Sequence, residues 1–215
     1  FIYEMINRNF LYRSKLSITF KIKKYDIFNM MNQFEGIPIP RIDDELFPEE
    51  FHPDIPTISC HRLAEIIENP SSYDQIIILD ARFQYEFNGG HIIGARNIIN
   101  SNQIADIYNN CSGKKTCLIC YCEFSQGRSP TLFKMIRSYD RNQHINDYPN
   151  LTIPNLYVLE SGYRSFYDNY PSLCVGGYIN MRDPQYIQNG TLKRCFSFYR
   201  KNMTQNSLIQ PNQYN

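Results

Sequence analysis

The stretch that most constrains the fold of this 215-residue chain runs from Thr116 to Pro130, with the sequence TCLICYCEFSQGRSP. Its first half is a continuous apolar run of the kind that forms a buried strand. Gly127 permits a close backbone turn. The Ser-Pro pair that follows is typical of the first turn of a helix. The sequence therefore predicts a strand, a tight loop and a helix start in immediate succession.

The loop of this unit carries the residue types of a phosphate site. Cys122 stands at the end of the predicted strand, and Arg128 follows six positions later. The loop amides and the helix N-terminus would point at one anion, which the planar guanidinium would bind through two parallel hydrogen bonds. The same positive field would hold Cys122 as a thiolate, the form that attacks. The spacing alone is weakly specific, and a structural cysteine beside a surface arginine is the alternative.

Alternating strands and helices surround this unit. The other predicted strands are Thr57–Ile58, Ile76–Leu79, Asn97–Ile99 and Tyr157–Leu159. The predicted helices run from Ser59 to Asn69, from Gln103 to Tyr108, from Ser129 to about Ser138 and from Gly162 to about Asp168, with a polar loop over 139–155. Such alternation predicts an α/β fold with a mostly parallel central sheet and helices on both faces.

Two charged residues follow the β-branched run that ends at Leu79. Asp80 and Arg82 would lie at the carboxyl end of a strand, where open α/β sheets have their clefts. They could be catalytic, but an ion pair that braces the loop is the favoured interpretation. His91 follows a Gly-Gly turn and is interpreted as a hydrogen-bonded buttress rather than a base.

The composition indicates three parts. Residues 1–56 form an N-terminal extension that ends in an acidic, proline-rich linker. Its basic residues interrupt each apolar run before about 18 residues, the length needed to span a bilayer, and no small-residue cleavage site supports a targeting peptide. Residues 57–182 form the predicted catalytic domain, and 183–215 a C-terminal tail that is partly disordered, from about Gln205.

Charge and cysteine spacing limit the partners that we expect. A net charge of +1 and a pI near 7.7 give no argument for nucleic acid or a membrane surface as partner. The seven cysteines have irregular spacing, and Cys117-x2-Cys120 lacks a second pair, so we expect no metal. A thiolate enzyme needs a reducing compartment, which indicates the cytoplasm or nucleus. We expect a monomer without a cofactor.

Three blocks of this sequence resemble the M-phase inducer phosphatases in order and spacing. They are Cys-Glu-Phe-Ser at 122–125 with Arg128 and Pro130, DARFQYEFNGGHIIGARN at 80–97, and LYVLESGYRSFY at 156–167. The resemblance covers roughly residues 57–182. It implies a rhodanese-like three-layer sandwich and a dual-specificity protein phosphatase that acts in cell division and mitosis. The implied substrate is a cyclin-dependent kinase, alone or with its cyclin.

The resemblance also implies roles for individual residues. Cys122 would be the nucleophile, Arg128 the phosphate clamp and Glu123 the debated general acid. The implied phosphate-binding residues are Glu123, Phe124, Ser125, Gln126, Gly127, Arg128 and Ser129. Candidate docking charges near the C-terminus are Arg182, Lys193, Arg194, Arg200 and Lys201.

Four positions depart from the family pattern. Tyr121 replaces a histidine, Gly127 a glutamate and Ser129 a glycine, and Ala81 stands where the family often has a protective cysteine. Gly-Arg-Ser is what tyrosine phosphatases carry after their cysteine, and there the hydroxyl assists departure of the thiolate. These changes bear on fine specificity more than on the reaction class.

Three other functions stay open on this fold. An arsenate reductase would use the same cradle, because arsenate mimics phosphate, but the extensions and the Cys174…Tyr178…Met181 run argue for a phosphatase. A sulfurtransferase typically has a loop one residue shorter. A catalytically silent module that docks a kinase would not need Cys122 and Arg128, which are both present.

Overall fold

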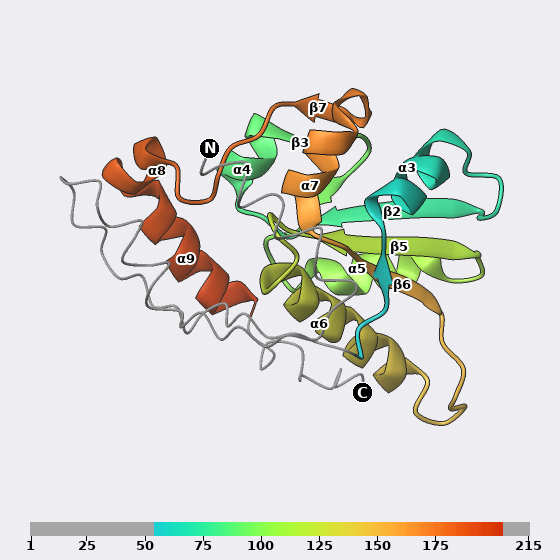
Figure 1. Ribbon diagram of the computed structural model, residues 1–215. Helices are drawn as coiled ribbons and strands as arrows, with labels where there is room; N and C mark the ends of the chain where they lie inside the picture. The colour runs from blue at the N-terminus through green and yellow to red at the C-terminus, as the bar shows by residue number, and fades with distance from the viewer. Residues whose placement is uncertain (1–53, 204–215) are drawn as a thin grey trace, which may run out of the picture. The chain divides into compact units, whose positions relative to one another are not determined.

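A computed structural model describes residues 54–203 (Figure 1). Expectations for the N-terminal extension up to residue 53 and for the Asn/Gln-rich end fall outside this range. Within it, a five-stranded sheet has the order β1-β6-β5-β2-β4, and all of its pairs are parallel. The strands are β1 (Thr57–Ile58), β2 (Gln75–Asp80), β4 (Arg96–Asn97), β5 (Thr116–Tyr121) and β6 (Asn155–Leu159). The predicted parallel sheet is confirmed.

The helices cover both faces of this sheet (Figure 1). On one face, α3 (Cys60–Glu68) and α7 (Gly162–Asn169) pack on a core that includes Ile119 and Tyr121 of β5. On the other lie α5 (Gln103–Cys111) and α6 (Arg128–Gln143). Every residue of β5 is buried, as expected for a strand that is covered on both faces.

Helix α6 is longer than the sequence predicted. We expected a loop from residue 139, but the helix continues to Gln143. Asp140, in its last turns, is fully buried and accepts hydrogen bonds from the amides of Thr152 (2.9 Å) and Ile153 (3.1 Å). These tertiary bonds stabilise helical turns that a polar local sequence does not predict.

Several elements at the carboxyl end of the sheet were not predicted. A two-stranded sheet pairs β3 (Gly90–Ile92) with β7 (Cys174–Gly176) in antiparallel register. Helix α4 (Gln84–Gly89) precedes it, and a short 3-10 helix spans Pro171–Leu173. The segment assigned to the tail contains α8 (Pro184–Gln188) and α9 (Thr191–Asn202).

Helix α9 packs on the residues that follow β2. Its Leu192, Phe196 and Tyr199 are buried, and the Phe196 ring meets the Phe83 ring edge-on at 5.1 Å. These contacts fix α9 beside Phe83. The domain boundary at residue 182 stays a prediction.

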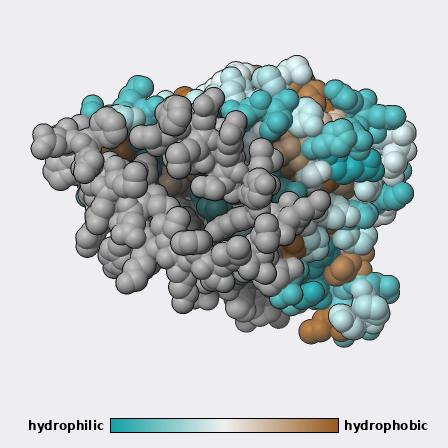
Figure 2. All heavy atoms as spheres, in the orientation of Figure 1, coloured by the Kyte–Doolittle hydropathy of each residue, from teal (hydrophilic) through white to brown (hydrophobic). Residues whose placement is uncertain are grey.

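The surface of the described region carries only scattered large apolar side chains. On the face shown in Figure 2, its residues are mostly hydrophilic, with isolated hydrophobic ones. The exposed large apolar residues are Ile93, Phe124, Ile145, Tyr148, Val175 and Phe198. Within residues 54–203 we find no helix with the length and apolar character that a bilayer span requires.

Candidate active site

The loop 122–127 joins the end of β5 to the start of α6 at the carboxyl end of the sheet (Figure 1). The predicted strand, loop and helix are all present. Cys122 opens the loop and is buried, with 4% of its surface exposed. Arg128 is the first residue of α6 and is equally buried. The folding of this local unit therefore brings the cysteine and the arginine to one place.

Helix α7 holds the start of the loop. The amide of Tyr163 donates to the Cys122 carbonyl (2.9 Å), and that of Arg164 donates to the Glu123 carbonyl (3.1 Å). Gly162 makes this approach possible: it has φ 64°, and a Cβ there would stand 2.5 Å from the Cys122 carbonyl oxygen. The first turn of α7 thus hydrogen-bonds the carbonyl groups of Cys122 and Glu123, the first two residues of the loop.

Two hydroxyl groups belong to the loop and the start of α6. The Ser129 hydroxyl donates to Cys122 Sγ at 3.4 Å, so the serine that departs from the family pattern contacts the sulfur. Ser125 has φ 56°. Its Oγ is buried and has no hydrogen-bond partner among the described residues. An unpaired buried hydroxyl is costly unless a ligand or water satisfies it, which fits an anion-binding loop.

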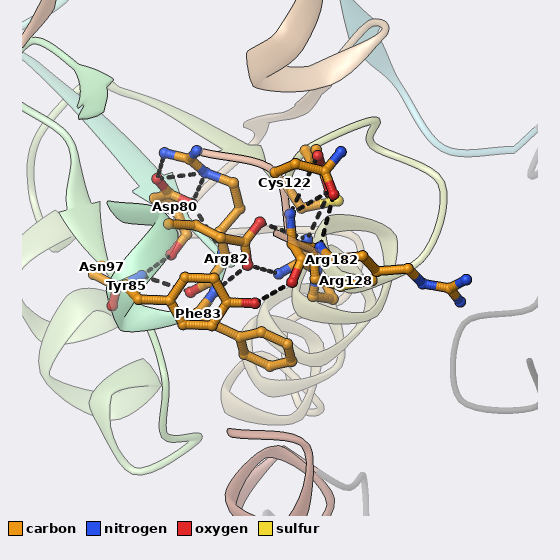
Figure 3. A network of polar contacts seen from close by, with 12 residues as sticks. Asp80, Arg82, Phe83, Tyr85, Asn97, Cys122, Arg128 and Arg182 are labelled. Carbon is orange, nitrogen blue, oxygen red and sulfur yellow. Dashed lines mark hydrogen bonds and ion pairs between the residues drawn. The ribbon is translucent and has the colours of Figure 1, made fainter. Parts of the chain in front are cut away.

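Arg128 lies beside Phe83 in a polar network (Figure 3) and is held by Glu86, to which the sequence assigned no role. Its Nη1 and Nη2 donate to the two carboxylate oxygens at 2.5 and 3.1 Å. The Phe83 ring lies 4.9 Å from the guanidinium carbon, and the Phe83 amide donates to Glu86 at 2.9 Å. Burial disfavours the charge of Arg128, but the Glu86 carboxylate more than compensates and holds its pKa above the usual value.

Glu123 lies in the same polar network. Its carboxylate is buried and accepts hydrogen bonds from the Tyr178 hydroxyl and from the Met181 amide. Arg128 Nη2 is 3.8 Å from its Oε2. Burial raises the pKa of Glu123, while the Tyr178 hydrogen bond and the Arg128 charge oppose that rise. Tyr178 and Met181 come from a segment far along the chain, so sequence spacing did not connect them with Glu123.

The residues proposed as structural supports stand beside the loop. Arg82 and Asp80 form a fully buried ion pair, with Nη2 and Oδ2 2.7 Å apart. Arg82 also donates to the Gly90 carbonyl (2.6 Å) and lies 3.9 Å from the centre of the Tyr163 ring. His91 Nδ1 is 2.9 Å from the carbonyl oxygen of Phe87, the residue on whose ring it stacks.

Tyr121 fills the position of the family histidine. Its ring stacks near that of Tyr163, with centroids 5.9 Å apart, and lies 5.6 Å from the guanidinium carbon of Arg82. Its hydroxyl accepts a hydrogen bond from the Ile92 amide at 3.3 Å. The tyrosine therefore braces the base of the loop through ring packing.

A cavity of about 300 Å³ opens beside the site, between the end of β2 and α9. Its lining is largely apolar and includes Ala81, Phe83, Ile98, Cys195, Phe198 and Tyr199. The described part of the chain contains no cluster of His, Cys, Asp and Glu side chains that could hold a metal ion.

The family model for the rhodanese-like domain matches residues 61–169, and the chain belongs to this family. The resemblance to M-phase inducer phosphatases is also confirmed. The chain is 38% identical over 142 residues to the Cdc25-like protein phosphatase twine of Drosophila melanogaster, covering 62% of this chain and 33% of the relative. It is 37% identical over 137 residues to an M-phase inducer phosphatase of Emericella nidulans, covering 62% and 25%.

These alignments cover a third or less of the two relatives' own lengths. Among solved structures, an As-Sb reductase from Leishmania major is 20% identical, with a TM-score of 0.49, and the match covers 57% of this chain and 86% of that chain.

Proposed function

We propose that this chain is a dual-specificity protein phosphatase that hydrolyses phosphotyrosine and phosphothreonine through a cysteinyl-phosphate intermediate. The observation that carries the proposal is the arrangement of Cys122, Ser129 and Arg128 on one strand-loop-helix unit, with the serine hydroxyl on the sulfur and the guanidinium fixed by Glu86. Relatives named as phosphatases support the same reaction.

In the first step, the Cys122 thiolate attacks phosphorus. A sulfur–phosphorus bond forms, and the bond between phosphorus and the leaving oxygen breaks. The loop amides and Arg128 stabilise the equatorial oxygens as charge shifts onto them. Glu86 binds Nη1 and Nη2 of the guanidinium and so fixes the orientation of the planar group that contacts the phosphate.

The leaving alkoxide of phosphothreonine needs a proton, and we assign the role of proton donor to Glu123. Because its pKa is raised, a larger fraction of this carboxyl is protonated near neutral pH than of the carboxyl of an ordinary glutamate. In the second step, water attacks the phosphoryl group and the sulfur–phosphorus bond breaks. The Ser129 hydroxyl, 3.4 Å from the sulfur, then donates to the departing thiolate.

The proposed substrate is a cyclin-dependent kinase, alone or bound to its cyclin, in the cytoplasm or nucleus. The relatives include an M-phase inducer phosphatase, which supports a cell-cycle phosphoprotein as substrate. All five candidate docking charges are exposed, and four of them lie on α9. Their sign suits an acidic surface on the substrate.

Hydrolysis of an aryl phosphate by the native chain, Cys122→Ser and Arg128→Lys tests the proposal. We expect turnover only by the native chain, because serine is the weaker nucleophile and an ammonium cannot reproduce the two-point contact of arginine. Near-normal turnover by Cys122→Ser would overturn it. Arsenate reduction with glutathione, without phosphate hydrolysis, would instead identify a reductase.

A further inference from the structure

The segment 174–183, here called the strap, contacts the phosphate loop and is itself fixed to the domain. It begins with β7, which pairs with β3. The Gly177 amide extends this pairing through a 2.8 Å hydrogen bond to the carbonyl of Gly89, the last residue of α4. Further along, the Met181 carbonyl accepts a hydrogen bond from the Tyr85 hydroxyl. The strap is therefore anchored on both sides of Tyr178.

At the centre of the strap, the Tyr178 hydroxyl donates to Glu123 Oε1. The Met181 amide lies 3.4 Å from both oxygens of the same carboxylate. The Arg164 guanidinium lies 4.6 Å from the centre of the Tyr178 ring. Burial and the neighbouring Glu123 raise the pKa of Tyr178 to about 12, so the phenol keeps its proton at neutral pH and stays a donor.

Other charged and titratable groups also face Glu123. The Glu86 carboxylate on α4 adds to the effect of burial and raises the pKa of Glu123, whereas Arg128 on α6 lowers it. The Tyr85 phenol interacts with Glu123 as well, and burial raises its own pKa, so it stays uncharged. Among these groups, the Tyr178 hydroxyl is the one that makes a short hydrogen bond to the carboxylate.

We propose that Tyr178 is a positioning residue whose hydroxyl holds the Glu123 carboxyl in one orientation at the start of the phosphate loop and stabilises its ionised form. The proposal deepens the proposed function, on which its kinetic part rests, because an aligned carboxyl is what transfer of a proton to the leaving oxygen requires. The strap thereby links a segment that follows α7 to the reacting centre.

The first test needs no turnover. In protein labelled with ¹³C at the glutamate side-chain carboxyls, the Glu123 signal is assigned by its loss in Glu123→Gln and then titrated. Tyr178→Phe removes only the hydroxyl. Since a donor to a carboxylate favours the charged form, its loss should raise the midpoint, by about one pH unit. An unchanged midpoint in a folded Tyr178→Phe protein overturns the proposal.

A second variant distinguishes a hydrogen-bond effect on Glu123 from a general disturbance of the site. Fluorotyrosine at position 178 keeps the ring and makes the phenol a stronger donor, so the Glu123 midpoint should move down, opposite to Tyr178→Phe. Tyr167→Phe is the matched control, because the Tyr167 ring packs on Tyr163 and its hydroxyl bonds neither Glu123 nor Met181. Shifts of the same sign in both position-178 variants would contradict a hydrogen-bond effect.

Kinetics separate this inference from the proposed function. At a pH below the Glu123 midpoint of both proteins, where the carboxyl is protonated in each and only its orientation differs, Tyr178→Phe should lower kcat for a phosphothreonine substrate about tenfold. It should leave kcat for para-nitrophenyl phosphate within twofold, because nitrophenolate leaves without a proton. Equal losses on both substrates contradict the positioning role. If the midpoint moves but no preparation hydrolyses phosphate, the proposed function fails and the contact stands. If the native chain hydrolyses phosphate normally but Tyr178→Phe leaves the Glu123 midpoint unchanged, the proposed function stands and the positioning role of Tyr178 fails.

Discussion

The Arg128 guanidinium meets the Glu86 carboxylate through two hydrogen bonds, of 2.5 and 3.1 Å, and both side chains are buried. The pair joins the start of α6 to α4, elements that are 42 residues apart at this contact. Breaking a buried ion pair leaves one charge without compensation. Glu86 therefore both stabilises the fold and keeps the proposed phosphate clamp in place.

Glu86→Gln should lower the free energy of unfolding by about 3–5 kcal/mol and reduce kcat/KM for an aryl phosphate roughly 10²-fold, through a misplaced guanidinium. Urea unfolding and steady-state kinetics measure the two effects. The control is Glu65→Gln, which breaks the exposed pair with Arg62 and should change neither. A Glu86→Gln protein with native stability and activity would show that the pair has no such role.

The local unit around Cys122 and Arg128 could be predicted from the sequence because its signals are adjacent: an apolar strand, a glycine turn and a Ser-Pro helix start. The partners of these residues could not. Glu86 and Tyr178 reach the loop from 42 and 55 residues away in sequence, and only tertiary packing brings them there. The last turns of α6 were missed for the same reason, since distant amides bind Asp140.

Ser129→Ala should slow the second chemical step roughly 10- to 100-fold, because it removes the donor to the departing sulfur. The first step does not use this hydroxyl. A burst of product equal to the enzyme concentration should therefore appear before steady state in rapid-mixing measurements with an aryl phosphate. Absence of a burst, together with a native rate, would mean that Ser129 does not assist departure.

Peroxide should inactivate the native chain with poor recovery by thiols. Cys120, two residues before Cys122, is fully buried, and burial raises its pKa, so it supplies little thiolate to trap a sulfenic acid. Mass spectrometry after mild peroxide should show overoxidised Cys122. A dominant intramolecular disulfide of Cys122 with full rescue by thiols would refute this.

The variant Ala81→Cys should make the same inactivation reversible. Asp80 and Tyr121 are partners in the β2–β5 register, and the Ala81 amide donates to the Tyr121 carbonyl at 2.8 Å. Position 81 is therefore next to Cys122, at about the 4.8 Å spacing of paired strands, within the Cα range that disulfides tolerate. Treatment with a thiol should restore activity to the variant and not to the native chain.

The proposed kinase should be a better substrate than its isolated peptides, because docking charges outside the loop would contact its surface. Reversing Lys193 and Arg194, which are both exposed on α9, should lower kcat/KM for the intact phosphorylated kinase about tenfold and leave the aryl phosphate unaffected. Raising the salt concentration should likewise lower kcat/KM of the native chain for the intact kinase, because salt screens the docking charges. Equal efficiency on peptide and intact kinase would contradict docking.

The most direct test of the central claim is to trap the phosphorylated cysteine. The native chain is mixed with a phosphotyrosine substrate, quenched within one turnover and digested, and the peptide that contains Cys122 is weighed by mass spectrometry. We predict one added phosphoryl group on Cys122 in the native chain, and neither adduct nor turnover in Cys122→Ser. Turnover without an adduct on Cys122, or an adduct on another residue that survives in Cys122→Ser, would contradict the account.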